Sequence, residues 1–142
     1  MLSIYEKSNN ILEVILEFYF RYLENLRQVN YRFFEDIKKY PNVLGHMKKE
    51  RDNNQKATVQ FFQKGVEQGL FKDDLDMNIV IQLMNSQSDQ LMKDNLGRIY
   101  PLDEIFKTLI LIYIRGISTE KGNQILDELI TEYENKIKLN QK

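Results

Sequence analysis

The sequence predicts an all-α protein, and three observations carry this prediction. The 142 residues contain only two prolines, Pro41 and Pro101, and both fall where the helical spacing of apolar residues breaks. No run of residues alternates between apolar and polar in the way a half-buried strand does. Hydrophobic residues make up 42% of the chain and charged residues 29%, which is enough apolar material for the core of one soluble domain. We therefore expect a bundle of about six helices over residues 1–142.

The strongest pattern lies in residues 102–137, which we expect to form a hairpin of two helices. The first of these helices is apolar nearly all round, which predicts burial on more than one side. Gly116 suits a left-handed C-cap for it, and Ser118 or Thr119 suits the N-cap of the second helix. Gly122 lies on the apolar stripe of the second helix. A glycine there costs about 1 kcal/mol relative to alanine, which a close approach of another backbone would offset.

This hairpin has two interpretations. It can form half of a four-helix dimer interface, or it can be an ordinary helical hairpin packed on its own domain. The first interpretation predicts a two-fold homodimer, because the apolar surface left exposed would exceed what soluble monomers usually show. Its predicted interface residues are Leu102, Phe106, Leu109, Tyr113, Gly122, Ile125, Leu126, Leu129 and Tyr133.

The rest of the chain predicts four further helices, at about 11–28, 31–40, 42–68 and 77–94. Residues that suit helix ends flank them. Asn10 is an expected N-cap, Asp73, Asp74 and Asp76 together favour the start of the helix at 77–94, and Gly69 is an expected C-cap. Residues 1–7 read either as the end of a helix that begins upstream or as a frayed start.

Few side chains that commonly act in catalysis are present, since the chain has one histidine and no cysteine. It contains no phosphate-binding glycine motif and no Glu-x-x-His pair of the di-iron type, so we predict no enzymatic activity, no cofactor and no metal. A net charge of −1 without a long basic run argues against non-specific nucleic-acid binding. The N-terminus lacks a signal-peptide pattern, and the longest apolar run, Leu109 to Ile114, is far short of a membrane span. A cytoplasmic location without a membrane partner is therefore expected.

Polar residues interrupt the apolar stripes of the helices at 42–68 and 77–94. Because buried polar groups need partners, these faces can line a cavity in which a ligand or water meets them. The alternative is that each stripe turns out to solvent at mid-helix. Aromatic and methionine side chains beside a few polar groups are typical of a small-molecule site. The predicted lining is Phe18, Tyr22, Thr58, Phe61, Met84, Gln87, Ser88 and Tyr113, and Arg51 would favour an anionic ligand.

Three segments resemble the C-terminal regulatory domain of TetR-family transcriptional repressors. They are FFEDIKKYP at 33–41, GVEQGLFKDD at 65–74 and RGISTEKG at 115–122. The second resembles the family's G-x-x-x-G-x-[FL]-[RK]-x-D turn, and the third resembles its turn between the last two helices. The segments occur in the family's order and at its spacing, and together they extend over most of the chain.

The resemblance implies an all-helical domain that binds a small, mostly apolar effector and dimerises through its last two helices. The family reads DNA with a helix-turn-helix module ahead of this domain, and residues 1–7 leave no room for one. We therefore expect a fragment of a longer regulator, rather than a shortened relative, that reaches DNA only through a domain absent from this chain. The competing interpretation is a helical protein-interaction or structural domain with a solid core and no ligand.

Overall fold

The structure is a computed structural model that describes residues 10–27, 36–37 and 39–140. Its α-helices are α2 (Ile11–Arg27), α4 (Pro41–Glu67), α5 (Met77–Lys93), α6 (Leu102–Ile117) and α7 (Glu120–Asn140), with a short 3-10 helix, η1 (Asn95–Arg98). Across these residues no strand forms, and a single isolated bridge joins Phe71 to Ser118. The all-α prediction is confirmed for this part of the chain. The predicted helix at 31–40 lies mostly outside the described residues.

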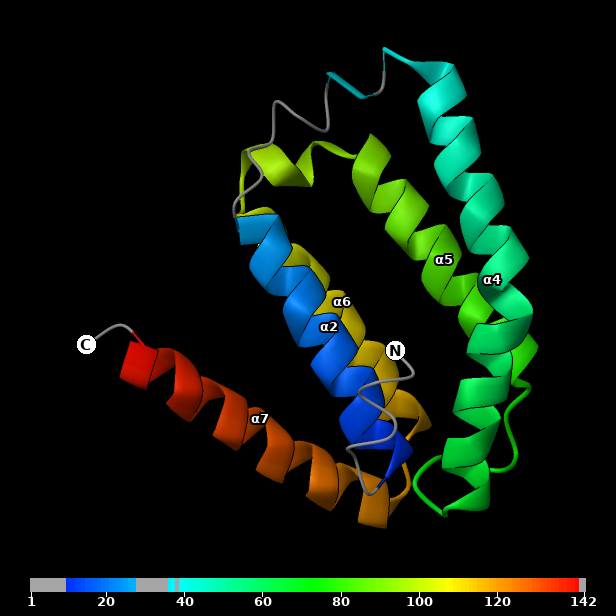
Figure 1. Ribbon diagram of the computed structural model, residues 1–142, viewed down its shortest axis with the longest axis vertical. Coiled ribbons are helices and arrows are strands. Elements are labelled where there is room, and N and C mark those ends of the chain that lie inside the picture. The colour runs from blue at the N-terminus through cyan, green and yellow to red at the C-terminus, as the bar shows by residue number, and fades with distance from the viewer. Residues whose placement is uncertain (1–9, 28–35, 38, 141–142) are drawn as a thin grey trace.

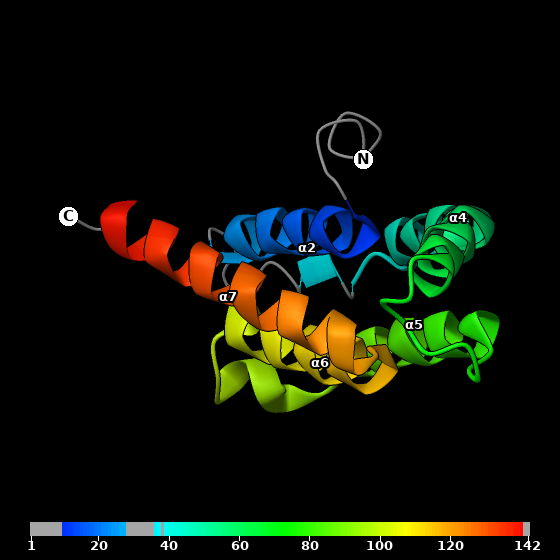
Figure 2. The ribbon, with the colours of Figure 1, turned by 90° about the horizontal axis from the view of Figure 1, so that it is seen from below.

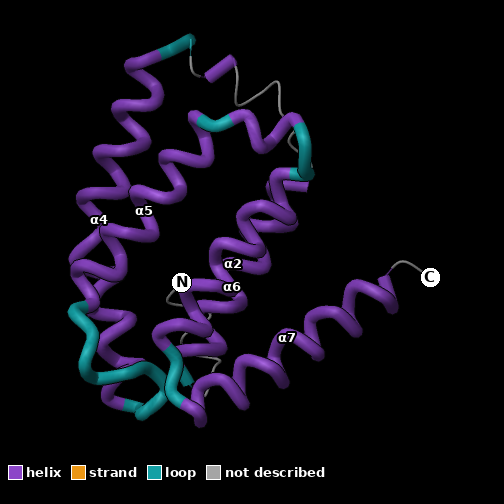
Figure 3. The backbone as a smooth tube through the Cα atoms, turned by 180° about the vertical axis from the view of Figure 1, so that it is seen from behind, coloured by secondary structure: helices purple, strands orange, loops and turns teal. Residues whose placement is uncertain are grey.

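The helices form two layers (Figures 1 and 2). α2 and α4 lie in one layer, and α6 and α5 lie in the other, with α2 over α6 and α4 over α5. α7 crosses one edge of the α2–α6 pair, and its C-terminal end diverges from the other helices (Figure 3). None of the helices in the described segments is both long and apolar enough to span a bilayer.

The predicted N-cap of α2 is confirmed, and Asp76 is the one of the three predicted aspartates that caps α5. The Asn10 side-chain oxygen accepts a hydrogen bond from the Glu13 N–H at 2.8 Å. The Asp76 carboxylate accepts one from the Asn78 N–H at 2.9 Å. Each bond satisfies a backbone donor that the first turn of a helix leaves without an intrahelical partner.

The glycines predicted at two helix ends behave differently. Gly69 ends α4 with a left-handed φ of 74°, and the Leu70 N–H donates to the Gly65 carbonyl, as in a Schellman motif. The same prediction for Gly116 is wrong, because α6 continues through it to Ile117. A backbone carbonyl at the C-terminal end of α6 has another partner: both the N–H and the hydroxyl of Ser118 donate to the Ile114 carbonyl.

The core lies where α2, the C-terminal third of α4 and the starts of α5 and α7 meet α6. α2 contributes a wide apolar face, as its two neighbouring stripes predict. α4 buries only Val59, Phe62 and Gly65. The large side chains that are almost fully buried are Ile11, Leu12, Ile15, Leu16, Phe62, Leu70, Phe71, Met77, Ile114 and Leu126.

Candidate ligand-binding site and dimer surface

The α4–α5 turn and the α6–α7 turn lie against each other at one end of the molecule (Figure 3). The Lys72 N–H donates to the Ile117 carbonyl at 2.8 Å, and the Thr119 N–H donates to the Leu70 carbonyl at 2.9 Å. We call these contacts, between residues 65–72 and 117–122, the base junction. It brings together the second and third segments that resemble the TetR family.

Two glycines allow the base junction to close. A Cβ atom on Gly122 would lie 2.1 Å from the Leu70 carbonyl oxygen, so the backbone that comes close to Gly122 belongs to the same chain. The Thr119 hydroxyl accepts a hydrogen bond from the Gly122 N–H at 3.1 Å, which makes Thr119 the N-cap of α7. A Cβ atom on Gly65 would lie 2.3 Å from the Phe71 ring. The junction therefore depends on the absence of side chains at both positions.

The apolar residues of the predicted pocket are distributed between the core and the surface. Met84 is buried in the core, and Phe61 and Tyr113 pack against that core. Phe18 and Tyr22 leave 45% and 42% of their surface exposed. The ring of Tyr22 meets Phe106 edge to face, which holds it near α6.

The polar residues of the predicted pocket have partners other than a ligand or lie near solvent. The half-buried Thr58 donates its hydroxyl to the Asn54 carbonyl in its own helix at 3.1 Å. Gln87 is exposed and Ser88 is half-buried. Residues 41–57 of α4 contain no buried residue, so the apolar stripe of this helix turns out to solvent.

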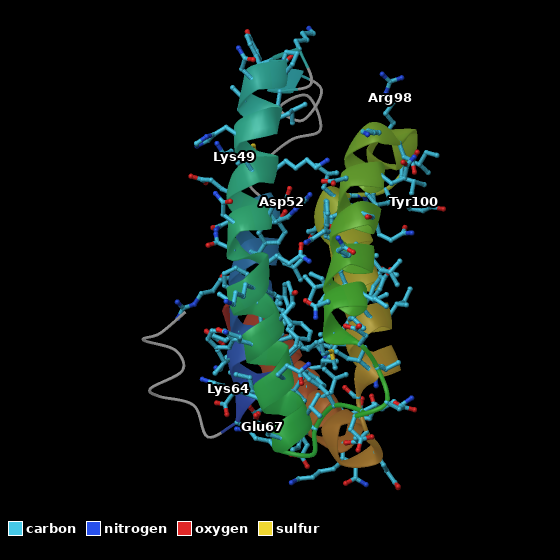
Figure 4. All side chains as sticks on the ribbon, turned by 90° about the vertical axis from the view of Figure 1, so that its right-hand side faces the viewer. Lys49, Asp52, Lys64, Glu67, Arg98 and Tyr100 are labelled. Carbon is cyan, nitrogen blue, oxygen red and sulfur yellow. The ribbon has the colours of Figure 1, made fainter. Side chains whose placement is uncertain are left out.

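Arg51 has a partner that the sequence analysis missed. Its guanidinium donates two hydrogen bonds to the Asp89 carboxylate on α5, at 2.6 and 2.8 Å. Arg51 lies in the N-terminal half of α4 and Asp89 lies toward the C-terminal end of α5. Lys49 and Asp52 mark the neighbouring part of α4 in Figure 4. The hydrogen bond from Arg51 lowers the pKa of Asp89 and raises that of Arg51. The Arg51 charge is compensated within the chain, which removes the reason to expect an anionic ligand.

Asp89→Asn should destabilise the chain at neutral pH but not in acid. The depressed pKa of Asp89 means that its contribution is present above the unfolded-state pKa near 4 and is lost as the pH falls through the folded-state value. Because the pair is about one-third exposed, we expect a loss of about 1 kcal/mol or less at pH 7. Urea unfolding at pH 7, 5 and 3 measures the difference. Asp73→Asn, in the exposed α4–α5 turn, is the control, and a difference that persists unchanged at pH 3 would contradict the assignment.

A cleft of about 230 Å³ separates α2 from α7. The aromatic rings of Phe20 and Tyr133 stack at 3.9 Å along it, and Leu16, Leu129 and Ile137 also line it. A smaller hollow of about 30 Å³, bounded in part by α6, shares the same aromatic pair. None of the nine predicted pocket residues lines either space.

The predicted dimer residues do not share one exposed surface. Phe106, Gly122 and Leu126 are buried within the chain, and Leu126 is completely inaccessible. The prediction that Gly122 and Leu126 lie in a dimer interface is therefore wrong, because α7 begins at the base junction and packs back onto α2. The half-buried members are Leu102, Leu109, Tyr113, Ile125, Leu129 and Tyr133.

Exposed apolar residues occur on several helices, and three of them, Ile79, Leu83 and Ile112, lie on α5 and α6. We call these three the outer face of the α5–α6 layer. Ile112 is 65% exposed and lies on the side of α6 opposite the buried Ile110 and Ile114. On α5, Ile79 and Leu83 are 56% and 50% exposed and lie on the side of the helix opposite the buried Met77 and Met84. Sequence analysis missed α5 as part of this face because it assigned the α5 stripe to a pocket.

Comparisons with protein-family models, curated proteins and solved structures gave no match to the chain. The TetR resemblance therefore depends on the three quoted segments, of which the first is described only in part, at residues 36–37 and 39–41. Within the described part of the chain, no group of three or more histidine, aspartate or glutamate side chains is placed to hold a metal ion.

Proposed function

We propose that this chain is the small-molecule-sensing and dimerisation domain of a TetR-like transcriptional repressor. The observation that carries the proposal is the base junction, in which two of the segments that resemble the family pack together. Two short similarities that arise by chance have no reason to lie in contact, whereas two parts of one shared structural unit do. The α2–α7 cleft and the outer face of the α5–α6 layer add support, because a sensor needs a ligand site and a dimer needs a surface.

The base junction also links the start of α2 to the rest of the domain. The Gln68 side-chain oxygen, just before Gly69, accepts a hydrogen bond from the Ile11 N–H at 2.9 Å. In the proposed repressor, the DNA-reading head precedes α2. An effector that binds two orientations of the helices with different affinity would shift the head through this link.

We propose that a second copy of the chain covers the outer face of the α5–α6 layer. An obligate two-fold interface typically buries on the order of 2,000 Å² or more, and its centre is rich in apolar residues. Ile79, Leu83 and Ile112 supply such residues on this face. This surface replaces the α7 stripe as the expected centre of the dimer.

The double variant Leu83→Glu/Ile112→Glu should be monomeric. Each carboxylate would be desolvated in the interface without a partner, at a cost of several kcal/mol, so the dimer should weaken by more than about 100-fold. Size-exclusion chromatography with light scattering measures the change. Gln63→Glu, which adds a charge to an exposed position of α4 in the other layer, should leave the dimer intact. A double variant that stays dimeric would show that this face is not the dimer interface.

The competing function is a helical interaction or structural domain without a ligand. Thermal denaturation with panels of cationic, neutral and anionic organic compounds separates the two. A ligand at 100 times its Kd stabilises the folded state by about 2.7 kcal/mol, which is a clear rise in Tm for a chain of this size. A sensor should respond to at least one compound class. The absence of any response in all three panels would favour the competing function.

A further inference from the structure

We infer that the cleft between α2 and α7 binds a small organic cation. This inference rests on the proposed function, since it names the site and the chemical class of the effector. It depends on three properties of the cleft: its apolar floor, its surplus of carboxylates and its size.

The floor of the cleft suits the hydrocarbon part of a ligand. Leu16 and Phe20 on α2 are buried at its base, and Leu129, Tyr133 and Ile137 line the α7 side. The stacked rings of Phe20 and Tyr133 join the two helices, so α7 is fixed to α2 across the cleft. The space is therefore a groove with an apolar floor, between two helices that the aromatic stack holds together.

The charges around the cleft favour a cation. Its lining includes the carboxylates Glu13, Glu17, Glu24 and Glu132 and the cations Arg21 and Lys136. Glu17 and Arg21 are engaged with each other at 3.3 Å. Three carboxylates then face one lysine, and among the described residues no ion pair engages Glu13, Glu24 or Glu132. This arrangement attracts a positive ligand and repels an anion.

The size of the cleft limits the ligand. Typical small-molecule sites enclose roughly 300 to 1,000 Å³, and this one offers about 230 Å³. A single aromatic ring that carries a quaternary ammonium group has an apolar body for the floor and a charge for the carboxylates. Aromatic side chains such as Phe20 and Tyr133 also attract such cations.

Phenyltrimethylammonium is a direct probe of the site, and benzenesulfonate is an anion of similar shape. Isothermal titration calorimetry at low salt should show one phenyltrimethylammonium bound per chain, with an affinity that falls as sodium chloride is added. Glu24→Gln/Glu132→Gln should weaken binding by about 3- to 10-fold, and Lys136→Gln should strengthen it by about 2-fold. Glu128→Gln, at an exposed α7 position outside the cleft lining, is the matched control. It should leave the affinity for phenyltrimethylammonium unchanged.

Several results would overturn the inference. They are the absence of phenyltrimethylammonium binding, equal binding of benzenesulfonate, or an affinity that the cleft variants leave unchanged. A change in dimerisation, rather than in ligand affinity, in Glu24→Gln/Glu132→Gln would also overturn it, since the cleft would then be covered by a second copy. If neutral or anionic compounds alone raise the Tm, the inference fails and the proposed function stands. If no compound class raises the Tm, the proposed function itself fails.

Discussion

Leu126→Glu should unfold the chain instead of only separating its subunits. Leu126 is completely inaccessible in the single chain, where it belongs to the core. The substitution removes a buried leucine side chain and places a carboxylate in an apolar site, so we expect a loss of roughly 4 kcal/mol or more. That is a large part of the 5 to 15 kcal/mol by which domains are usually stable. Circular dichroism during urea titration measures the effect.

The control for Leu126→Glu lies on the same helix. Leu139 is 69% exposed, and Leu139→Glu should change the free energy of unfolding by about 0.5 kcal/mol or less. A folded, monomeric Leu126→Glu chain of normal stability would instead restore the sequence-based interpretation, in which Leu126 contacts the partner subunit.

Gly122→Ala should open the base junction. The new Cβ atom would lie 2.1 Å from the Leu70 carbonyl oxygen, which is a backbone atom and has no rotamer to change. α7 must therefore move away from the α4–α5 turn. Overpacking of this kind costs about 1 to 3 kcal/mol, and the higher helix propensity of alanine recovers only part of it. Urea unfolding should show a net loss, and the Thr119 N–H, which bonds to Leu70, should lose its protection from hydrogen exchange.

The comparison for Gly122→Ala is the same change at Gly116. Gly116 lies inside α6, and no atom lies within 4 Å of the position that its Cβ would occupy. Gly116→Ala should therefore stabilise the chain by about 0.5 to 1 kcal/mol. Equal effects of the two substitutions would contradict the close approach at Gly122.

The helix ends were predictable because their signals are local. Asn10, Asp76 and Gly69 act through hydrogen bonds or backbone angles within their own turns, so the sequence around each of them is sufficient. Gly116 shows the limit of such signals. The Ser118 hydroxyl and N–H satisfy the end of α6, and the left-handed residue that Gly116 would have supplied is not needed.

The candidate site was harder to predict because periodicity shows which residues share a face but not what covers that face. Leu126 shares a stripe with Leu129 and Tyr133, yet its own domain covers it. To predict that Arg51 pairs with Asp89, one must know how α4 and α5 are aligned along each other. No local sequence pattern contains this information. The α2–α7 cleft joins helices that are far apart in the sequence, so its lining emerges only from the packing of α7.

Native mass spectrometry tests the central claim, a ligand-sensing dimer, most directly, because it reports assembly and ligand binding together. The chain has a mass of 17.0 kDa, so we predict a species of twice that mass at micromolar concentration. In the presence of small organic cations, that species should gain up to two ligand masses, one for each α2–α7 cleft. A bare monomer of 17.0 kDa that gains no mass from cationic, neutral or anionic compounds would contradict the account.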